Sequence, residues 1–171
     1  MSYELSGGKI VCDMIKKPSE CSDKELTEYY NLAVKGNQVD KNGLKERIEQ
    51  AILLAFHYEN NSLVGIAALK YPHESYKNGV FKKAEVPLES DKYKFEFGWA
   101  YTEPEYRGKH ICSNLTHKIL ESEVSQNIYA ITKDEKMKKK LMENGFKKNG
   151  EPYLGERTKD PLLLFTKKII S

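Results

Sequence analysis

The sequence has 171 residues, a length that fits one domain with a single hydrophobic core. Its 28 basic and 25 acidic side chains leave a formal net charge of +3, which is too balanced to indicate nucleic-acid binding by itself. No apolar run reaches the roughly 18 residues of a membrane span, and the N-terminus lacks a signal-peptide core. We therefore expect one cytoplasmic domain, residues 1–171, that does not enter a membrane.

The cysteine pattern argues against a metal site. The three cysteines are an odd number, and no cluster of histidine and cysteine has the spacing of zinc ligands. We expect free thiols and no bound metal. These residues are Cys12, Cys21 and Cys112.

The first third of the sequence predicts a strand, two helices and a hairpin. Ser22 and Glu25 form a capping box that opens a helix over 23–35, and Gly36 follows its end. A short second helix is predicted over 41–50. Two apolar runs, 51–58 and 62–71, then flank a pair of asparagines, which tolerate the left-handed conformation of a tight turn and so indicate a β-hairpin.

The middle of the sequence predicts a polar excursion and a central strand. Residues 72–91 are polar and longer than a typical connection, so we expect them to leave the core and to contribute to specificity. Residues 92–102, KYKFEFGWAYT, alternate: the large aromatic side chains share one face, and Glu96, Gly98 and Ala100 lie on a more open face.

The rest of the sequence alternates helices and strands. After PEYRGKHICSNL, residues 104–115, a helix is predicted with Ile111, Leu115 and Ile119 inward. A strand over 127–132 precedes a helix that ends at Asn144-Gly145 and places Met137, Leu141 and Met142 inward. Two strands, 146–153 and 161–170, follow. This order predicts a mixed α/β sheet with helices on both faces.

Two segments resemble the GNAT superfamily of N-acetyltransferases. The first is FEFGWAYTEPEYRGKHICSNL, a strand followed by a Pro-Glu-Tyr turn and an Arg-Gly pair that opens a helix. The second is a helix that ends in Leu-x-x-x-Gly-Phe, here Leu141 to Phe146. The resemblance covers about residues 8–170 and implies a GNAT-like central mixed sheet of six to seven strands. It also implies an acyl-CoA-dependent N-acyltransferase.

The resemblance implies a binding site for acetyl-CoA, the acyl donor. Its pyrophosphate would meet backbone amides at the start of a helix, where unpaired N–H groups and a partial positive charge favour anions. Its pantetheine arm would pair with the backbone of the central strand. The implied donor-binding residues are Trp99, Ala100, Tyr101, Thr102, Arg107, Gly108, Lys109, His110, Ile111, Cys112 and Ser113.

Two residues depart from the family pattern Gln/Arg-x-x-Gly-x-Gly/Ala. His110 and Cys112 stand at its two small-residue positions. If the backbone keeps a negative φ at His110, the side chain points outward and the loop still binds phosphate. If a positive φ is required there, the histidine costs about 1–2 kcal/mol.

Catalysis needs a base and an acid. An ordinary alkylamine has a pKa near 10.4, so only about one molecule in two thousand is neutral at pH 7, and a general base helps. The resemblance makes Glu96 that base, whereas a structural alternative pairs it with a lysine. Leu141 occupies the position where many relatives carry a tyrosine that acts as the general acid. Tyr153, His110 or water would therefore protonate the leaving thiolate, with Tyr153 ranked first.

The acceptor remains open. A small primary amine is one class, and a macromolecule such as a protein or a charged tRNA is another, because seven lysines lie between Lys133 and Lys148. A third possibility is a catalytically idle GNAT-like module that binds CoA or a partner, which the altered loop and Leu141 favour. Edge strands of the predicted sheet would allow a homodimer.

Overall fold

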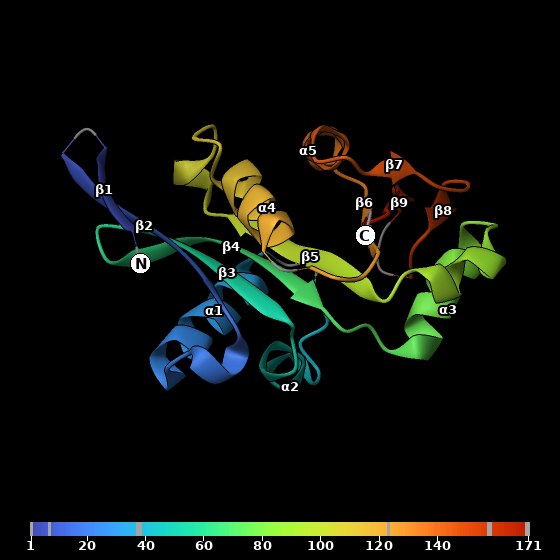
Figure 1. Ribbon diagram of the computed structural model, residues 1–171, viewed down its shortest axis with the longest axis horizontal. Helices are drawn as coiled ribbons and strands as arrows, with labels where there is room; N and C mark the ends of the chain where they lie inside the picture. The colour runs from blue at the N-terminus through green and yellow to red at the C-terminus, as the bar shows by residue number, and fades with distance from the viewer. Residues whose placement is uncertain (1, 7, 37–38, 123, 157–158, 170–171) are drawn as a thin grey trace. The chain divides into compact units, whose positions relative to one another are not determined.

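A computed structural model describes residues 2–6, 8–36, 39–122, 124–156 and 159–169 (Figure 1). The chain separates into two units, Met1–Lys70 with Gly98–Glu123 and Tyr71–Phe97 with Val124–Ser171. Strand β5 (Phe95–Thr102) runs from the second unit into the first. Within the described residues, no helix has the length and apolar character needed to cross a membrane.

The first unit contains an antiparallel sheet. Strands β1 (Ser2–Ser6), β2 (Lys9–Lys16), β3 (Leu53–Glu59) and β4 (Ser62–Lys70) pair in chain order. The β3–β4 hairpin turns at Asn60 and Asn61, whose φ angles are 48° and 65°. The predicted hairpin is therefore confirmed, together with the left-handed turn on which the prediction depended.

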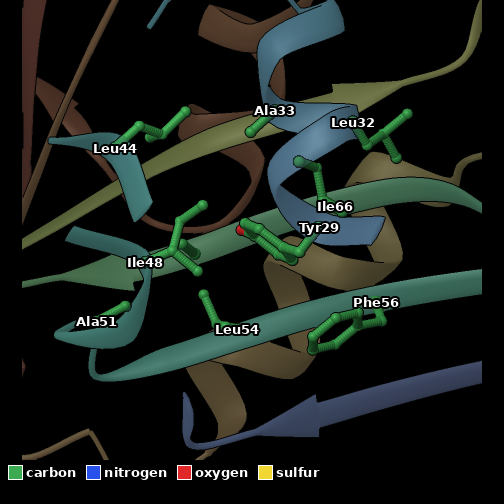
Figure 2. Close-up of a cluster of buried hydrophobic side chains, with 10 residues drawn as sticks. Tyr29, Leu32, Ala33, Leu44, Ile48, Ala51, Leu54, Phe56 and Ile66 are labelled. Atoms are coloured by element: carbon green, nitrogen blue, oxygen red, sulfur yellow. The ribbon is translucent and has the colours of Figure 1, made fainter. Parts of the chain in front are cut away.

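Helices α1 (Asp23–Lys35) and α2 (Leu44–Glu49) pack on one face of this sheet (Figure 2). The capping box is present: the Glu25 amide donates to Ser22 Oγ at 3.2 Å, and the Ser22 amide donates to the Glu25 carboxylate at 2.8 Å. Tyr29 is fully buried, with its ring edge-on to Phe56 at 5.3 Å between centroids and its hydroxyl donating to the Ala67 carbonyl at 2.7 Å. Helix α2 is shorter than predicted because Gly43 is left-handed, with φ of 64°, immediately before it.

Helix α4 (Ile111–Glu121) packs on the opposite face of the same sheet. Alternation explains the two faces: Phe56 and Ile66 point toward α1, whereas Gly65 lies beneath α4. A Cβ atom at Gly65 would stand 2.5 Å from Ile111 Cγ2, so the absence of a side chain there allows the first turn of α4 to approach the strand closely. Helices therefore cover both faces, as the sequence predicts.

The second unit combines the start of β5 with β6 (Ile128–Thr132), β7 (Lys147–Lys148), β8 (Tyr153–Leu154) and β9 (Pro161–Lys167). Strand β6 is parallel to β5 and antiparallel to β9, and β9 also pairs with β7 and β8. Its helices are α3 (Glu74–Lys83) and α5 (Glu135–Glu143).

Three predictions about this unit are wrong. Residues 72–91 do not leave the core as expected, because they form α3 and part of a 3-10 helix (Pro87–Lys92), and Val80 and Phe81 are buried. The predicted strand 146–153 is split into β7 and β8 by Gly150, whose φ is 75°. Met142 is 55% exposed and does not face the core. The described residues form nine strands, because β1 is additional and the predicted strand 146–153 is divided into two, which raises the seven predicted segments to nine.

The alternation predicted for the central strand is interrupted. Trp99 lies within β5 with a φ of 49°, a left-handed conformation that breaks the two-residue period. Phe95, Glu96 and Phe97 are all buried, whereas the residues from Gly98 onward are partly exposed. The division into one aromatic and one open face therefore does not hold along the whole strand.

Candidate active site

The loop between β5 and α4 contains two left-handed residues directly before a helix, and we expect it to be the anion-binding loop. A short 3-10 helix, Pro104–Tyr106, follows β5, and Gly108 and His110 then have positive φ angles of 85° and 60°. His110 is the residue before the first turn of α4 and is exposed. Of the two conformations considered for His110, the structure has the left-handed one, so the loop forms with a histidine at a position that favours glycine.

The first residues of α4 differ in burial from the loop before them. Ile111 and Cys112 are 3% and 8% exposed, so the Cys112 thiol is not presented as a nucleophile. Ser113 is half-buried. A Cβ atom at Gly108 would meet no atom within 4 Å, which means that open space lies beside the loop.

Arg107 and Lys109 are held in different ways. Arg107 is exposed, its Nε donates to the Thr102 carbonyl at 3.0 Å, and its guanidinium lies 5.7 Å from the ring centroid of Tyr101. Lys109 Nζ lies 3.1 Å from both carboxylate oxygens of Glu59. The Thr102 hydroxyl is buried, without a hydrogen-bond partner in the part of the chain that is described. An exposed guanidinium and an unused hydroxyl thus lie at the end of β5, where the donor is expected.

The donor-side residues of β5 have mixed environments. Trp99, Ala100, Tyr101 and Thr102 are each half-buried. The Trp99 ring packs edge-on to Tyr29 with 6.4 Å between centroids, so its side chain belongs to the core of the first unit. Only the backbone of Trp99 is then available for a ligand.

Glu96 lies among tyrosines in the second unit. It is 5% exposed, and the hydroxyl of Tyr129 donates to Glu96 Oε2 at 3.3 Å. The charge of Glu96 also acts on Tyr76 and Tyr153. We call Glu96, Tyr76, Tyr129 and Tyr153 the tyrosine cluster.

The tyrosine cluster keeps its phenols protonated. Burial, reinforced by the charge of Glu96, raises the pKa of Tyr153 to about 12. Burial and then Glu96 also raise the pKa of Tyr129 and that of Tyr76. These phenols therefore carry a proton at neutral pH.

Tyr153 is positioned by a close backbone contact. The amide of Glu151 donates to the Ala84 carbonyl at 2.9 Å, and a Cβ atom at Gly150 would stand only 2.1 Å from that carbonyl oxygen. The segment before β8 is thereby fixed against the end of α3. The Tyr153 hydroxyl is buried with no partner among the described residues, whereas Leu141, at the family's tyrosine position, is fully buried in α5.

The parallel pairing of β5 with β6 is short. Its register comprises Phe95 with Ile128 and Glu96 with Tyr129. The pairing thus ends at the residue expected to be the general base. In the predicted binding mode of acetyl-CoA, the pantetheine arm would pair with the backbone of β5 after Glu96, where β6 no longer pairs with it.

No protein-family model matches the chain, and no curated protein matches its sequence. Solved structures do match. An acyl-CoA N-acyltransferase from Pseudomonas aeruginosa is similar over 92% of this chain and 99% of its own, with a TM-score of 0.67 and 13% identity. Escherichia coli ElaA matches over 92% and 99%, with a TM-score of 0.65 and 16% identity. A GNAT-family acetyltransferase from Bacillus cereus matches over 94% and 99%, with a TM-score of 0.62 and 19% identity.

The chain has the GNAT fold. The resemblance read from the two sequence segments is thereby confirmed at the level of the fold, as is the mixed sheet with helices. Identities of this size carry no residue roles, so the site of this GNAT-fold protein is argued from its own side chains.

Sequence reasoning missed several residues of these sites. Tyr129 was assigned only to a strand, although a parallel register beside β5 would have placed it near Glu96. Tyr76 was missed because its segment was expected to leave the core. The contacts of Glu59 and His57 were not predicted either, and His57 Nδ1 lies 2.5 Å from Asp13 Oδ1. All these contacts join residues that are distant in the sequence, and no local pattern encodes them.

Proposed function

We propose that the protein is an acyl-CoA-dependent N-acyltransferase that transfers an acetyl group from acetyl-CoA to a primary amine. The observation that carries the proposal is the buried Glu96 beside protonated tyrosines on the same strand that leads into the anion-binding loop. The GNAT fold, shared with structures described as acyltransferases, supports it.

The donor would be held by the residues of the loop. Backbone amides at the start of α4 would donate hydrogen bonds to the pyrophosphate oxygens, and the Arg107 guanidinium would add charge. The open space beside Gly108 fits this use, since no side-chain atom lies within 4 Å of the place where its Cβ would stand. Acetyl-CoA supplies a thioester whose carbonyl carbon is open to nucleophilic attack.

The residues of the tyrosine cluster would move the protons. Glu96 would accept a proton from the acceptor ammonium, directly or through water, so that the neutral amine can attack. Tyr153 would protonate the departing thiolate. Because a thiol has an ordinary pKa of about 8.5, its release needs less acid assistance than that of an alkoxide, which is consistent with a phenol whose pKa is raised.

Binding of acetyl-CoA, measured by calorimetry, tests the donor half of the proposal. We expect the wild-type protein to bind and Arg107→Glu to lose binding, because the reversal places a negative charge beside the pyrophosphate. Transfer to a panel of primary amines, with Glu96→Gln as the control, tests the chemistry. Binding without transfer to any amine would contradict the acyltransferase proposal.

A catalytically idle CoA- or partner-binding module is the second candidate. It is favoured by the left-handed histidine in the loop and by Leu141, which offers no hydroxyl. Absence of acetyl-CoA binding by the wild type, with binding restored in His110→Gly, would support it.

A macromolecular acceptor, such as a protein side chain or a charged tRNA, remains a variant of the leading proposal. Lys136, Lys139, Lys147 and Lys148 are exposed on α5 and β7. If these lysines dock RNA, binding should weaken steeply as salt is raised, whereas transfer to a small amine should depend little on salt.

A further inference from the structure

We propose that Glu59 is a positioning residue for the acyl-CoA-binding loop, and that Lys109 anchors this loop to the sheet instead of binding phosphate. The inference rests on the proposed function, because it assigns a role in donor binding. It is carried by a network of charged side chains beneath α4 that the proposed chemistry does not use. We call Asp13, His57, Glu59, Lys109 and Lys118 the anchor network.

Glu59 is buried at the end of β3, with 5% exposure. Both of its carboxylate oxygens lie 3.1 Å from Lys109 Nζ, and Lys109 also lies 4.7 Å from the ring centroid of Tyr106. A buried carboxylate is strongly destabilising without a partner. If Lys109 turned toward a phosphate, this buried charge would lose its closest cation and, among the described residues, keep only the longer contacts to Lys9 Nζ at 3.9 Å and His57 Nε2 at 3.8 Å. The geometry therefore favours a lysine that remains on Glu59 while its backbone belongs to the loop.

A second anchor lies farther along α4. Lys118 Nζ is 2.8 Å from Asp13 Oδ2, and His57 Nδ1 is 2.5 Å from the other oxygen of that carboxylate. The Nε2 atom of His57 is buried, has no hydrogen-bond partner in the described chain, and faces Glu59 Oε1 at 3.8 Å. His57 thus lies between the carboxylates of Asp13 and Glu59. The loop before α4 and the helix itself are each tied to the sheet by a lysine.

Close packing between the two anchors limits movement of the helix. Ile111, the first residue of α4, contacts the strand at Gly65, where even one added carbon would clash. Anchors on either side of this contact would hold the first-turn amides in a fixed orientation before any donor arrives. Such preorganisation raises affinity because less conformational freedom is lost on binding.

A double-mutant cycle on acetyl-CoA affinity tests the assignment. Glu59→Gln, Lys109→Met and the double variant would be compared with the wild type by calorimetry. If Lys109 acts through Glu59, each single change should weaken acetyl-CoA binding by about tenfold. The double variant should then lose no more affinity than either single variant. Lys9→Met is the matched control, since Lys9 Nζ lies 3.9 Å from Glu59 but outside the loop.

The sign of the Glu59→Gln effect is decisive. If Lys109 binds phosphate, removing the charge of Glu59 would free the ammonium and tighten binding, which would overturn the proposal. Additive effects of the two single changes would overturn it as well.

A measurement without ligand separates this inference from the proposed function. Hydrogen exchange of the amides of 108–113 should become faster in Lys109→Met and stay unchanged in Lys9→Met. The side chain of Lys109 is 42% exposed in the wild type, so the substitution should leave the fold intact. Unchanged exchange in Lys109→Met would overturn the anchoring role. Faster exchange together with no acetyl-CoA binding by the wild type would instead overturn the proposed function, and with it the role in donor binding.

Discussion

Two buried glutamates, one in each unit, have the same 5% exposure but different neighbours. Glu59 lies against the ammonium group of Lys109, with 3.1 Å between Lys109 Nζ and Glu59 Oε1. Glu96 accepts a hydrogen bond from a phenol and lies beside two more. A carboxylate held by a lysine is suited to fixing a backbone, whereas one among phenols is suited to exchanging protons. Burial alone therefore does not identify a catalytic carboxylate, and the chemistry of its neighbours has to be considered.

The largest effect should come from Glu96→Gln. We expect kcat to fall by about 100- to 10,000-fold, the usual contribution of a general base, while acetyl-CoA affinity stays unchanged. Steady-state kinetics and calorimetry measure the two quantities. Glu59→Gln is the matched control, because it replaces an equally buried carboxylate and should act mainly on donor affinity. Equal losses of kcat in both variants would remove the distinction between the two glutamates.

Asp13→Asn should reduce stability and change its dependence on pH. Burial acts to raise the pKa of Asp13, but hydrogen bonds from His57 and Lys118 outweigh it and lower the pKa below its ordinary 3.8. A carboxyl group with a lowered pKa stabilises the folded state above its unfolded pKa and loses this contribution as pH falls through its folded pKa. We expect a loss of about 2 kcal/mol at pH 7.

Denaturant unfolding at several pH values measures this effect. The stability curves of the wild type and Asp13→Asn should converge as pH falls below 3.8, the ordinary value for this group. A constant difference down to the lowest pH at which the protein folds would show that Asp13 acts through packing and not through its charge.

Tyr153→Phe should have a smaller effect on turnover. Removing one weak acid from a reaction with a thiol leaving group should lower kcat by about tenfold, with little change in KM for the donor. Tyr129→Phe is the control, because it removes a hydroxyl of the same cluster that is already engaged with Glu96. Rapid-quench measurement of the transfer step would show whether the loss lies in chemistry. A larger loss in Tyr129→Phe would make Tyr129 the better candidate for the acid.

The smallest effect should come from His110→Gly. The left-handed backbone at His110 predicts that glycine stabilises the fold by about 1 kcal/mol. Gly108→Ala provides the converse test, since an added Cβ meets no atom there and only the positive φ opposes it. Thermal unfolding should therefore move in opposite directions for the two variants. A shift in the same direction would mean that contacts, and not the backbone, set these effects.

Much of the fold was predictable because its signals are local. The capping box at Ser22 and Glu25 set the start of α1, and the asparagine pair set the β3–β4 turn. The Arg107-Gly108 pair and the apolar spacing after it placed α4. Each of these rests on contacts between residues close in sequence, which single-sequence patterns encode.

The rest depended on distant contacts. Phe81 of helix α3 packs against Tyr93 and Tyr129, and no local sequence pattern predicted that it would be buried. The left-handed Trp99 within β5 was hidden by a regular alternation of residue types. Glu96 and Tyr153 were chosen through a family resemblance, and their roles stay predictions. The structure adds that both belong to one cluster with two tyrosines that sequence reasoning did not include.

Gly150 has a consequence for how this protein tolerates sequence change. Any side chain at this position would collide with the Ala84 carbonyl, and relief would require β8, which carries Tyr153, to move away from the end of α3. Gly150, which is not among the residues proposed to contact either substrate, would then determine the position of the Tyr153 hydroxyl. Mutational surveys should accordingly find Gly150 among the positions where turnover declines although folding and donor affinity persist, and a search confined to residues around the reacting atoms would overlook it.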